Sequence, residues 1–362
     1  MLSDNHPPIV LVSSAGMADE IDSAYISRSC QTDLLRLVVD SLPNEVAQSI
    51  ESELRVLQHA PPKVVLLAVK AADPEIYKSA ATSIRNCIVL QPPDVPRLLH
   101  NLISHPAHIL PSDESNQRKS IVRLFDALLH RTRVTPTRDE YAMFAAYGGA
   151  LRSAALRGGV GAALSDTVGD VIAVGTAEVP SFGGGQYWED DVRDARDFHL
   201  GYDPATRARL DTVKSMLEIL QDRFDFEGVG LSDLAEDVLS TFDSRANSNG
   251  VGHGTAAAQT FESLGRVVHA EMAALLVAAR NGVRPVGMTM YITAQPCRQC
   301  IRHLVAAGIS RVVYFGDRLQ SPPSFHADAV ETIESPAGSP GRMLLVPFDG
   351  FSPALLMRLF VL

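Results

Sequence analysis

The feature that most constrains this chain is a pair of short motifs, each at the start of a helical pattern. The first is His269-Ala270-Glu271, in an otherwise apolar run. The second is Pro296-Cys297-Arg298-Gln299-Cys300, which follows after 24 further residues that contain a strand pattern. Taken singly, His269 would be read as a packed core histidine and the two cysteines as a redox pair or as buried thiols. Their order along the chain favours a metal site.

One imidazole and two thiolates supply the three protein ligands of a catalytic zinc site, in which a fourth position is left open. Cys297 follows a proline at the start of its helix, where the positive end of the helix dipole favours the thiolate. His269 begins the other helix, so two helix starts are expected to converge on one ion. We therefore predict one Zn²⁺ per chain, bound by His269, Cys297 and Cys300.

Glu271 is not needed as a ligand and is expected to face the open position. There it can take a proton from zinc-bound water and return it to a leaving amine, as a general acid-base residue. A zinc ion that only stabilises the fold would leave Glu271 without a role. H-x-E followed by P-C-x-x-C is the signature of zinc-dependent base deaminases.

Composition limits the remaining possibilities. The chain has 362 residues, 46% of them hydrophobic, which is enough for two or three globular domains. Its formal net charge of −10 disfavours a broad surface for long nucleic acid. Four cysteines are too few for a disulfide scaffold. No signal peptide or membrane span is evident, so we expect a cytoplasmic protein with no membrane partner.

The first 133 residues show alternating short strand and helix patterns, which predict a small α/β domain with an open sheet. The strand candidates are PPIVLVSS, PKVVLLAVK and NCIVLQPP, and an amphipathic helix is expected at RKSIVRLFDALLH. We place the domain boundary between residues 133 and 134.

Residues 134–362 form the second predicted domain. Thr135 or Thr137 is expected to cap its first helix, and residues 159–180 to form a β-hairpin. Loops and helices are expected at about 185–262, with a polar, mobile run at 243–259. Helices and strands then alternate to the end, with helices from His269, Cys297 and Pro353.

The second domain resembles the deoxycytidylate deaminase family of the cytidine deaminase superfamily. It is most similar to bacterial anti-phage deoxycytidine nucleotide deaminases, in which a P-loop kinase-like domain precedes the deaminase. The motifs that carry the resemblance lie between Thr135 and Pro353 and read TPTRDEYAMFAAYGGALRSA, VGAAL, EVPSFGGGQYW, DARDFHLGYD, GRVVHAEMAALL, PCRQC, AAGISRVVY, FHADAV and PFDGFSP.

The resemblance implies a fold, a reaction and partners. The fold is an α/β/α sandwich with a mixed sheet, preceded by a smaller, degenerate P-loop-like α/β domain. The reaction is hydrolytic deamination of a free deoxycytidine nucleotide, dCTP or dCMP, which would deplete these nucleotides in anti-phage defence. A homo-oligomer is implied, and the N-terminal domain is a candidate site for a regulatory RNA or protein.

Three departures from the family pattern bear on the substrate. Ala177 stands where the family has an asparagine that contacts the nucleotide. Gly158-Gly159 replaces an Arg-Gln pair, and Arg157 lies one place earlier. No GxxxxGK[ST] follows the first strand, so the N-terminal domain is expected to be a scaffold or regulatory unit and not a kinase.

The substrate contacts are assigned by position to Arg157, Ala177, Tyr187, Trp188 and Pro296. Glycines 183–185 allow the loop before Tyr187 and Trp188 to lay an aromatic ring on a base; the alternative is a surface loop fixed by a buried tryptophan. Two other functions stay open. One is the same chemistry on another amine, such as an adenine nucleotide. The other is a zinc-containing nucleotide- or RNA-binding regulator or sensor with little turnover.

Overall fold

The structure is a computed structural model, and its chain divides into two compact units. One unit comprises residues 1–144 and 348–362, and the other comprises residues 145–347. The domain boundary between residues 133 and 134 stays a prediction. The structure describes residues 9–11, 88–91, 102–104, 107–111, 114–128, 132–156, 158–221, 230–248, 265–316, 326–332 and 341–360.

The unit of residues 145–347 is built on a mixed six-stranded sheet. Its strand order is β5-β4-β6-β7-β9-β8. β4 pairs antiparallel with β5 and β6, whereas β6, β7, β9 and β8 run parallel to one another. The β4–β5 pair confirms the predicted hairpin. The strands are β4 (Gly161–Ser165), β5 (Val171–Thr176), β6 (Thr289–Ile292), β7 (Arg311–Tyr314), β8 (Val330–Thr332) and β9 (Met343–Pro347).

Helices approach both faces of this sheet closely at two glycines. A Cβ on Gly161 would lie 1.9 Å from the carbonyl oxygen of Ala146, in α5 (Arg138–Leu151). A Cβ on Gly175 would lie 2.0 Å from that of Ala270, in α9 (Ala270–Arg280). Thr176, which pairs with Gly161, donates its hydroxyl to the carbonyl of Gly149 in α5. Strand residues alternate in direction, so α5 and α9 cover opposite faces of the hairpin.

The core between α9 and the sheet is made mostly of small side chains on the helix and larger ones on the strands. Alanines 270, 274 and 278 of α9 are buried at 0–1% exposure. This small-residue face lets α9 lie close to the hairpin. The same core contains Leu164, Met290, Ile292, Ile301, Leu304, Val312 and Tyr314.

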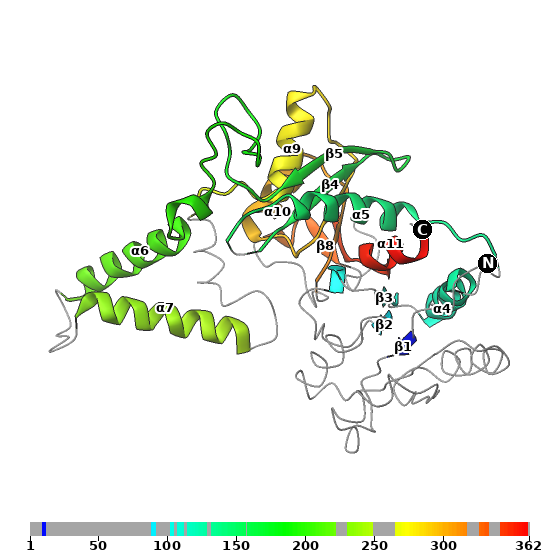
Figure 1. Cartoon of the computed structure of the whole chain (residues 1–362), viewed down its shortest axis with the longest axis horizontal. Coiled ribbons are helices and arrows are strands. Elements are labelled where there is room, and N and C mark those ends of the chain that lie inside the picture. The colour runs from blue at the N-terminus through cyan, green and yellow to red at the C-terminus, as the bar shows by residue number, and fades with distance from the viewer. Residues whose placement is uncertain are drawn as a thin grey trace, which may run out of the picture. The chain divides into compact units, whose positions relative to one another are not determined.

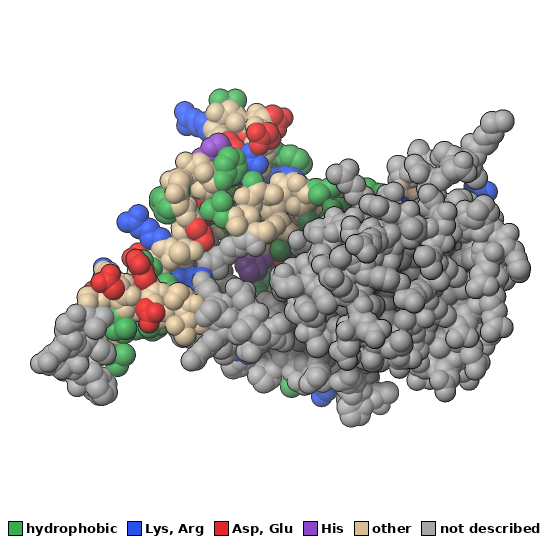
Figure 2. Space-filling model, turned by 60° about the horizontal axis from the view of Figure 1, so that its bottom comes forward, with side chains coloured by type: hydrophobic (Ala, Val, Ile, Leu, Met, Phe, Trp, Pro, Cys, Tyr) green, Lys and Arg blue, Asp and Glu red, His purple; other side chains and the backbone are tan. Residues whose placement is uncertain are grey.

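Two helices between the hairpin and α9 form a helical hairpin of their own (Figure 1). α6 (Pro204–Gln221) and α7 (Leu231–Ser248) pack through Val213, Ala235 and Leu239. The run at 243–259 that was predicted to be polar and mobile begins within α7, which continues through Ser248, and residues 249–259 lie outside the described residues. On the face shown in Figure 2, the basic side chains that are coloured lie scattered among acidic and apolar ones.

The other unit contains a second sheet of order β1-β2-β3-β10. β1, β2 and β3 are parallel, which agrees with the predicted α/β alternation, and β10 pairs antiparallel with β3. No pattern had predicted β3 or β10. The elements are β1 (Ile9–Leu11), β2 (Ile88–Gln91), η2 (Leu102–Ser104), β3 (Ala107–Ile109), α4 (Glu114–Leu128), β10 (Gly350–Phe351) and α11 (Pro353–Phe360).

The residues of the predicted second strand, 62–70, and those directly after β1 lie outside the described residues. Among the helices that the structure describes, none combines the length and apolarity needed to cross a membrane.

A buried carboxylate, that of Glu140, joins three parts of this unit. It accepts hydrogen bonds from Arg123 of α4 at 2.7 and 2.6 Å and from the Phe351 amide of β10 at 2.8 Å. The Thr137 amide donates to it at 2.7 Å, and the Glu140 amide donates to the Thr137 hydroxyl at 3.2 Å. This reciprocal pair is a capping box, which identifies Thr137 as the cap of α5. Burial alone would raise the pKa of the Glu140 carboxyl group, but the hydrogen bonds from Arg123, Phe351 and Thr137 outweigh this effect and hold its pKa below the ordinary value.

We expect Glu140→Gln to lower the free energy of unfolding by about 2 kcal/mol, because it leaves Arg123 without its carboxylate. Since the folded pKa lies below the ordinary value, the stabilisation is present above pH 4.5 and is lost as the pH falls through the folded pKa. Urea unfolding at pH 7 and at pH 4 measures both effects. Asp126→Asn, on α4 one turn after Arg123, is the control, and an equal loss in the control would contradict the prediction.

Candidate metal centre and active site

His269 occupies the N-cap of α9, as predicted. Its backbone is extended, with φ −64° and ψ 148°, and its side chain makes no capping hydrogen bond to the helix. The imidazole is therefore not used to satisfy the first turn of α9. Its carbonyl accepts the first helical bond, from the Ala273 amide at 2.9 Å.

Cys297 occupies the N-cap of α10 (Arg298–Ala306), again as predicted, with φ −73° and ψ 164°. It follows the carboxyl end of β6 after a short turn, and Cys300 lies in the first turn of α10. The helix therefore presents its positive end to both sulfurs. Pro296 is buried immediately before this turn.

The three predicted ligands converge. The His269 Nδ1 atom lies 3.6 Å from the Cys297 Sγ and 3.4 Å from the Cys300 Sγ. All three donor atoms lie within 4.8 Å of one another. Tetrahedral zinc, with Zn–S of about 2.3 Å and Zn–N of about 2.0–2.1 Å, requires an S···N separation of about 3.6 Å. The donor set and its spacing therefore fit zinc, and a nitrogen ligand at Nδ1 places the imidazole proton on Nε2.

The environment of the thiols favours ionisation of one of them. The Cys300 side chain and the imidazole of His269 lower the pKa of Cys297 to about 4, against the effect of burial. The proximity of Cys297 and burial raise the pKa of Cys300. A pair of sulfurs that shares one proton at neutral pH is suited to lose it to a divalent cation.

Glu271 lies in the first turn of α9, two residues after His269, and is only 3% exposed. Burial raises the pKa of its carboxyl group. A carboxyl with a raised pKa exchanges protons more readily near neutral pH than an exposed one. Its role as the general acid-base residue stays a prediction.

Ala177 directly follows β5 and precedes Glu178, whose backbone pairs with Val268, the residue before the predicted ligand His269. Its side chain is 7% exposed and packs in the core cluster that contains Ala270, the residue after His269. Its amide donates to Val160 at 2.8 Å, and its carbonyl accepts from the Ser153 hydroxyl at 2.6 Å. Both backbone groups are thus used within the protein, and the side chain is a methyl group that offers no hydrogen bond.

The adjacent Glu178 is a buried carboxylate to which no role had been assigned from the sequence. It is 1% exposed and accepts hydrogen bonds from the amides of Ala154 at 2.7 Å and Val179 at 2.8 Å. Its own backbone pairs with Val268, immediately before His269. The only sequence signal was its place in the EVP motif beside Ala177.

Trp188 is 54% exposed, so the alternative of a surface loop fixed by a buried tryptophan is wrong. The guanidinium of Arg152 lies 3.6 Å from the centroid of its ring and donates to the carbonyls of Gln186 at 3.2 Å and Tyr187 at 3.0 Å. The preceding glycines 183–185 all adopt positive φ. A substrate role for Tyr187 and Trp188 stays a prediction.

Arg157 lies outside the described residues, and Gly158 has φ +102°.

Residues 242–316 match the family model described as the cytidine and deoxycytidylate deaminase zinc-binding region. This segment contains all three predicted ligands and Glu271, and the chain therefore carries a zinc site of this kind.

Three comparisons with individual proteins accompany this match. The deoxycytidylate deaminase of Enterobacteria phage T4 is 47% identical over 47 residues, which are 13% of this chain and 24% of that protein. ComE operon protein 2 of Bacillus subtilis (strain 168) is 40% identical over 57 residues, 16% of this chain and 30% of that protein. The match thus spans only about a quarter to a third of these relatives. The crystal structure of the cyanophage S-TIM5 dCMP deaminase in apo form gives a TM-score of 0.30 at 14% identity, covering 59% of this chain and 99% of that one. That TM-score is too low to identify a common fold.

We expect Cys300→Ser and Cys297→Ser to lose the metal, because a hydroxyl is a poor zinc ligand. Inductively coupled plasma mass spectrometry of the purified proteins should find about one zinc per chain in the wild type and nearly none in either variant. Cys87→Ser, outside the ligand group, is the matched control. Full zinc content in Cys300→Ser would contradict the assignment.

Proposed function

We propose that this protein is a zinc-dependent hydrolytic deaminase of a free deoxycytidine nucleotide. Water replaces the amino group on C4 of the cytosine, which yields the uracil form and ammonia. One observation carries the proposal: one imidazole nitrogen and two sulfurs converge at the spacing zinc requires, with the buried Glu271 two residues from the imidazole.

The residues of the site have two separate roles, metal binding and proton transfer. His269, Cys297 and Cys300 hold the metal, and zinc bound there supplies a Lewis acid that activates water for attack. Glu271 accepts a proton from the attacking water and delivers it to the departing amino nitrogen, so that ammonia leaves as a neutral molecule. Its burial excludes bulk water from this proton transfer.

A pyrimidine deoxynucleotide is the proposed substrate because the zinc-binding segment is similar to that of deoxycytidylate deaminases. Ala177 removes one side-chain contact from the pattern of that family. Gln186 does not replace the contact, because its amide donates to the carbonyls of Thr176 at 2.5 Å and Glu178 at 3.3 Å and its oxygen accepts from Arg152 at 3.2 Å. We assign the base platform to the exposed ring of Trp188, held on one face by Arg152.

The decisive experiment measures ammonia and nucleotide products from the purified protein with dCMP, dCTP, dAMP, dATP, cytidine and adenine nucleosides, and short oligonucleotides and RNA. We expect turnover of dCMP or dCTP. Glu271→Gln should reduce it by about 10²–10⁴-fold while the zinc content stays that of the wild type, because the proton carrier is lost and the ligands are not.

The outcomes separate the candidate functions. Turnover of adenine nucleotides alone would overturn the proposed substrate and retain the chemistry. Full zinc content without turnover of any compound, together with nucleotide or RNA binding by calorimetry, would replace the enzyme with a zinc-containing sensor. Glu218→Gln, an exposed carboxylate on α6, is the matched control for loss of a negative charge.

We further propose that the unit containing β1, β2 and β3 is a degenerate P-loop-like domain with a scaffold or regulatory role. The parallel order of these strands and the absence of GxxxxGK[ST] from the sequence support this assignment. The segment after β1 where that motif would lie is outside the described residues.

The proposal extends to anti-phage defence by nucleotide depletion, which is supported by the motif resemblance over Thr135 to Pro353. Cells that express the wild type should show a lower plating efficiency of a DNA phage than cells that express Glu271→Gln at equal protein level. Nucleotide pools extracted during infection should show loss of dCTP only with the wild type. Equal plating with both proteins would contradict the defence role and leave the deaminase proposal intact.

A further inference from the structure

The imidazole of His269 depends for its direction on the short segment before it, residues 266–268. His269 itself has an extended backbone and makes no side-chain cap to α9. The helix therefore fixes the residues after the ligand, and residues 266–268 determine how the chain enters it. Val267 packs against the core, and two hydrogen-bonding contacts with distant parts of the chain hold the residues on either side of it, Arg266 and Val268.

The first contact is made by the backbone. Val268 donates to the Glu178 carbonyl at 3.0 Å and accepts from the Glu178 amide at 3.3 Å, as an isolated antiparallel bridge. Glu178 is in turn fixed by its own buried carboxylate, which accepts the Ala154 and Val179 amides. This bridge ties Val268 to Glu178, two residues after β5. A single residue pair, however, still allows the chain on either side of Val268 to rotate about the bridge.

The second contact is made by a side chain, that of Arg266. Its Nε atom donates to the Asp197 Oδ1 at 2.6 Å, and a terminal nitrogen donates to the Ala195 carbonyl at 2.5 Å. The Asp197 side chain is 7% exposed and that of Arg266 is 41% exposed. A charge-assisted bond to a buried carboxylate is stronger and more directional than a surface ion pair. Together, the two contacts fix the segment at both ends.

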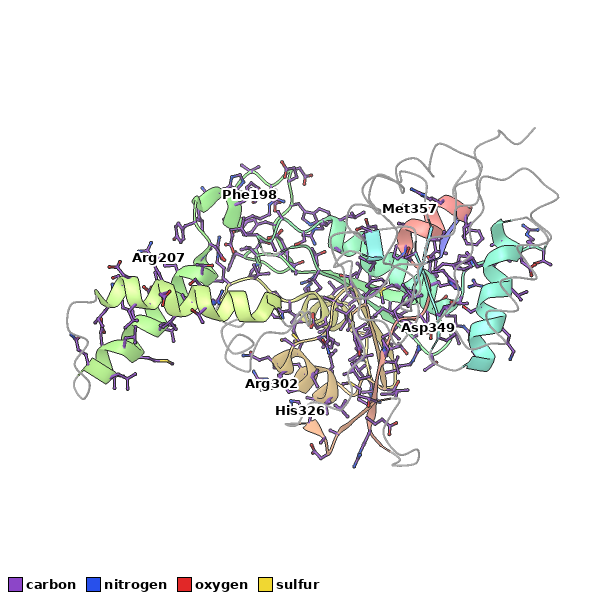
Figure 3. The ribbon with its side chains drawn as sticks, turned by 90° about the horizontal axis from the view of Figure 1, so that it is seen from below. Phe198, Arg207, Arg302, His326, Asp349 and Met357 are labelled. Atoms are coloured by element: carbon purple, nitrogen blue, oxygen red, sulfur yellow. The ribbon has the colours of Figure 1, made fainter. Side chains whose placement is uncertain are left out.

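The acceptor loop that presents Asp197 is itself well supported. Arg196, 5% exposed, donates through Nε to both carboxylate oxygens of Asp194 at 2.9 Å and through a terminal nitrogen to Glu189 at 2.5 Å. The hydrogen bonds of Arg196 hold the pKa of Asp194 well below its usual range. Asp197 begins the short helix η3 (Asp197–Leu200), which Phe198 marks in Figure 3. Arg266 thus binds to a turn that has its own hydrogen-bond network.

We propose that Arg266 and Asp197 are positioning residues for the metal ligand His269: their ion pair sets the entry of residues 266–268 into α9 and with it the approach of Nδ1 to the zinc. The inference rests on the zinc site of the proposed function. Neither residue is itself a metal ligand. The pair holds the nitrogen donor, which is the only donor that comes from α9, in register with the two sulfurs that come from α10.

The size of the effect follows from the tolerance of metal geometry. A ligand must sit within about 0.5 Å of its position, and the loss of a supporting contact around a zinc site costs about 10–100-fold in affinity. Since Arg266 acts three residues from the ligand, the lower end of that range applies. A purely structural ion pair would lower the melting temperature of the metal-free protein and leave the affinity for zinc unchanged.

The experiment measures the dissociation constant for Zn²⁺ of the full chain by competition with a chromophoric chelator. We expect Arg266→Gln and Asp197→Asn each to weaken zinc binding about tenfold. The double variant should be no weaker than the single ones, because both remove the same contact. The visible spectrum of the Co²⁺-loaded protein should change in intensity in the same variants, because it reports the symmetry of the nitrogen and sulfur ligands.

Arg284→Gln is the matched control, because Arg284 is exposed and within the described residues no hydrogen bond or ion pair is found for it. Zinc affinity within twofold of the wild type in both Arg266→Gln and Asp197→Asn would overturn the inference, as would equal weakening in the control. If Arg266→Gln does not fold, Arg266→Lys is measured instead; it keeps the charge, loses the fork of donors and should weaken binding less. A wild type that binds no zinc would refute the proposed function, whereas unchanged affinity in the variants refutes only the positioning role.

Discussion

The structure of the candidate site depends on the meeting of two helix starts. His269 and Cys297 are the N-caps of α9 and α10, and both have an extended backbone at the point where a helix begins. A side chain at an N-cap lies at the end of its helix and not on the lateral surface of the helix. It also requires that α9 lie very close to the sheet that carries β6, because α10 begins where β6 ends. Gly175 and the alanines of α9 make that approach possible.

The sequence predicted the elements around the zinc site well, and the reason is physical. The ligands lie at element boundaries that proline, glycine and apolar runs mark clearly, so His269, Cys297 and Cys300 could be assigned to helix starts without any knowledge of packing. The β4–β5 hairpin and the Thr137 cap were likewise local signals. Each of these features is determined by fewer than about ten neighbouring residues.

The features that were missed depend on contacts between distant residues. α7 continues through Ser248, into a run with several Asp, Ser and Asn residues of low helix propensity, and its earlier turns are supported by packing of Ala235 and Leu239 on Val213. β10 has two residues and exists because Phe351 pairs with His108 of β3 and donates to Glu140. The Arg266–Asp197 pair joins residues 69 positions apart. Neither hydrophobic periodicity nor motif spacing in a single sequence predicts such pairs.

The division of the ligands between two elements has a thermodynamic consequence. One donor belongs to α9 and two belong to α10, so an ion bound by all three crosslinks two helices that the chain joins through 17 residues, 281–297. A crosslink that forms only in the folded state adds its binding free energy to folding, in proportion to the logarithm of the free zinc concentration. The concentration of free zinc thus acts on how much of this protein stays folded.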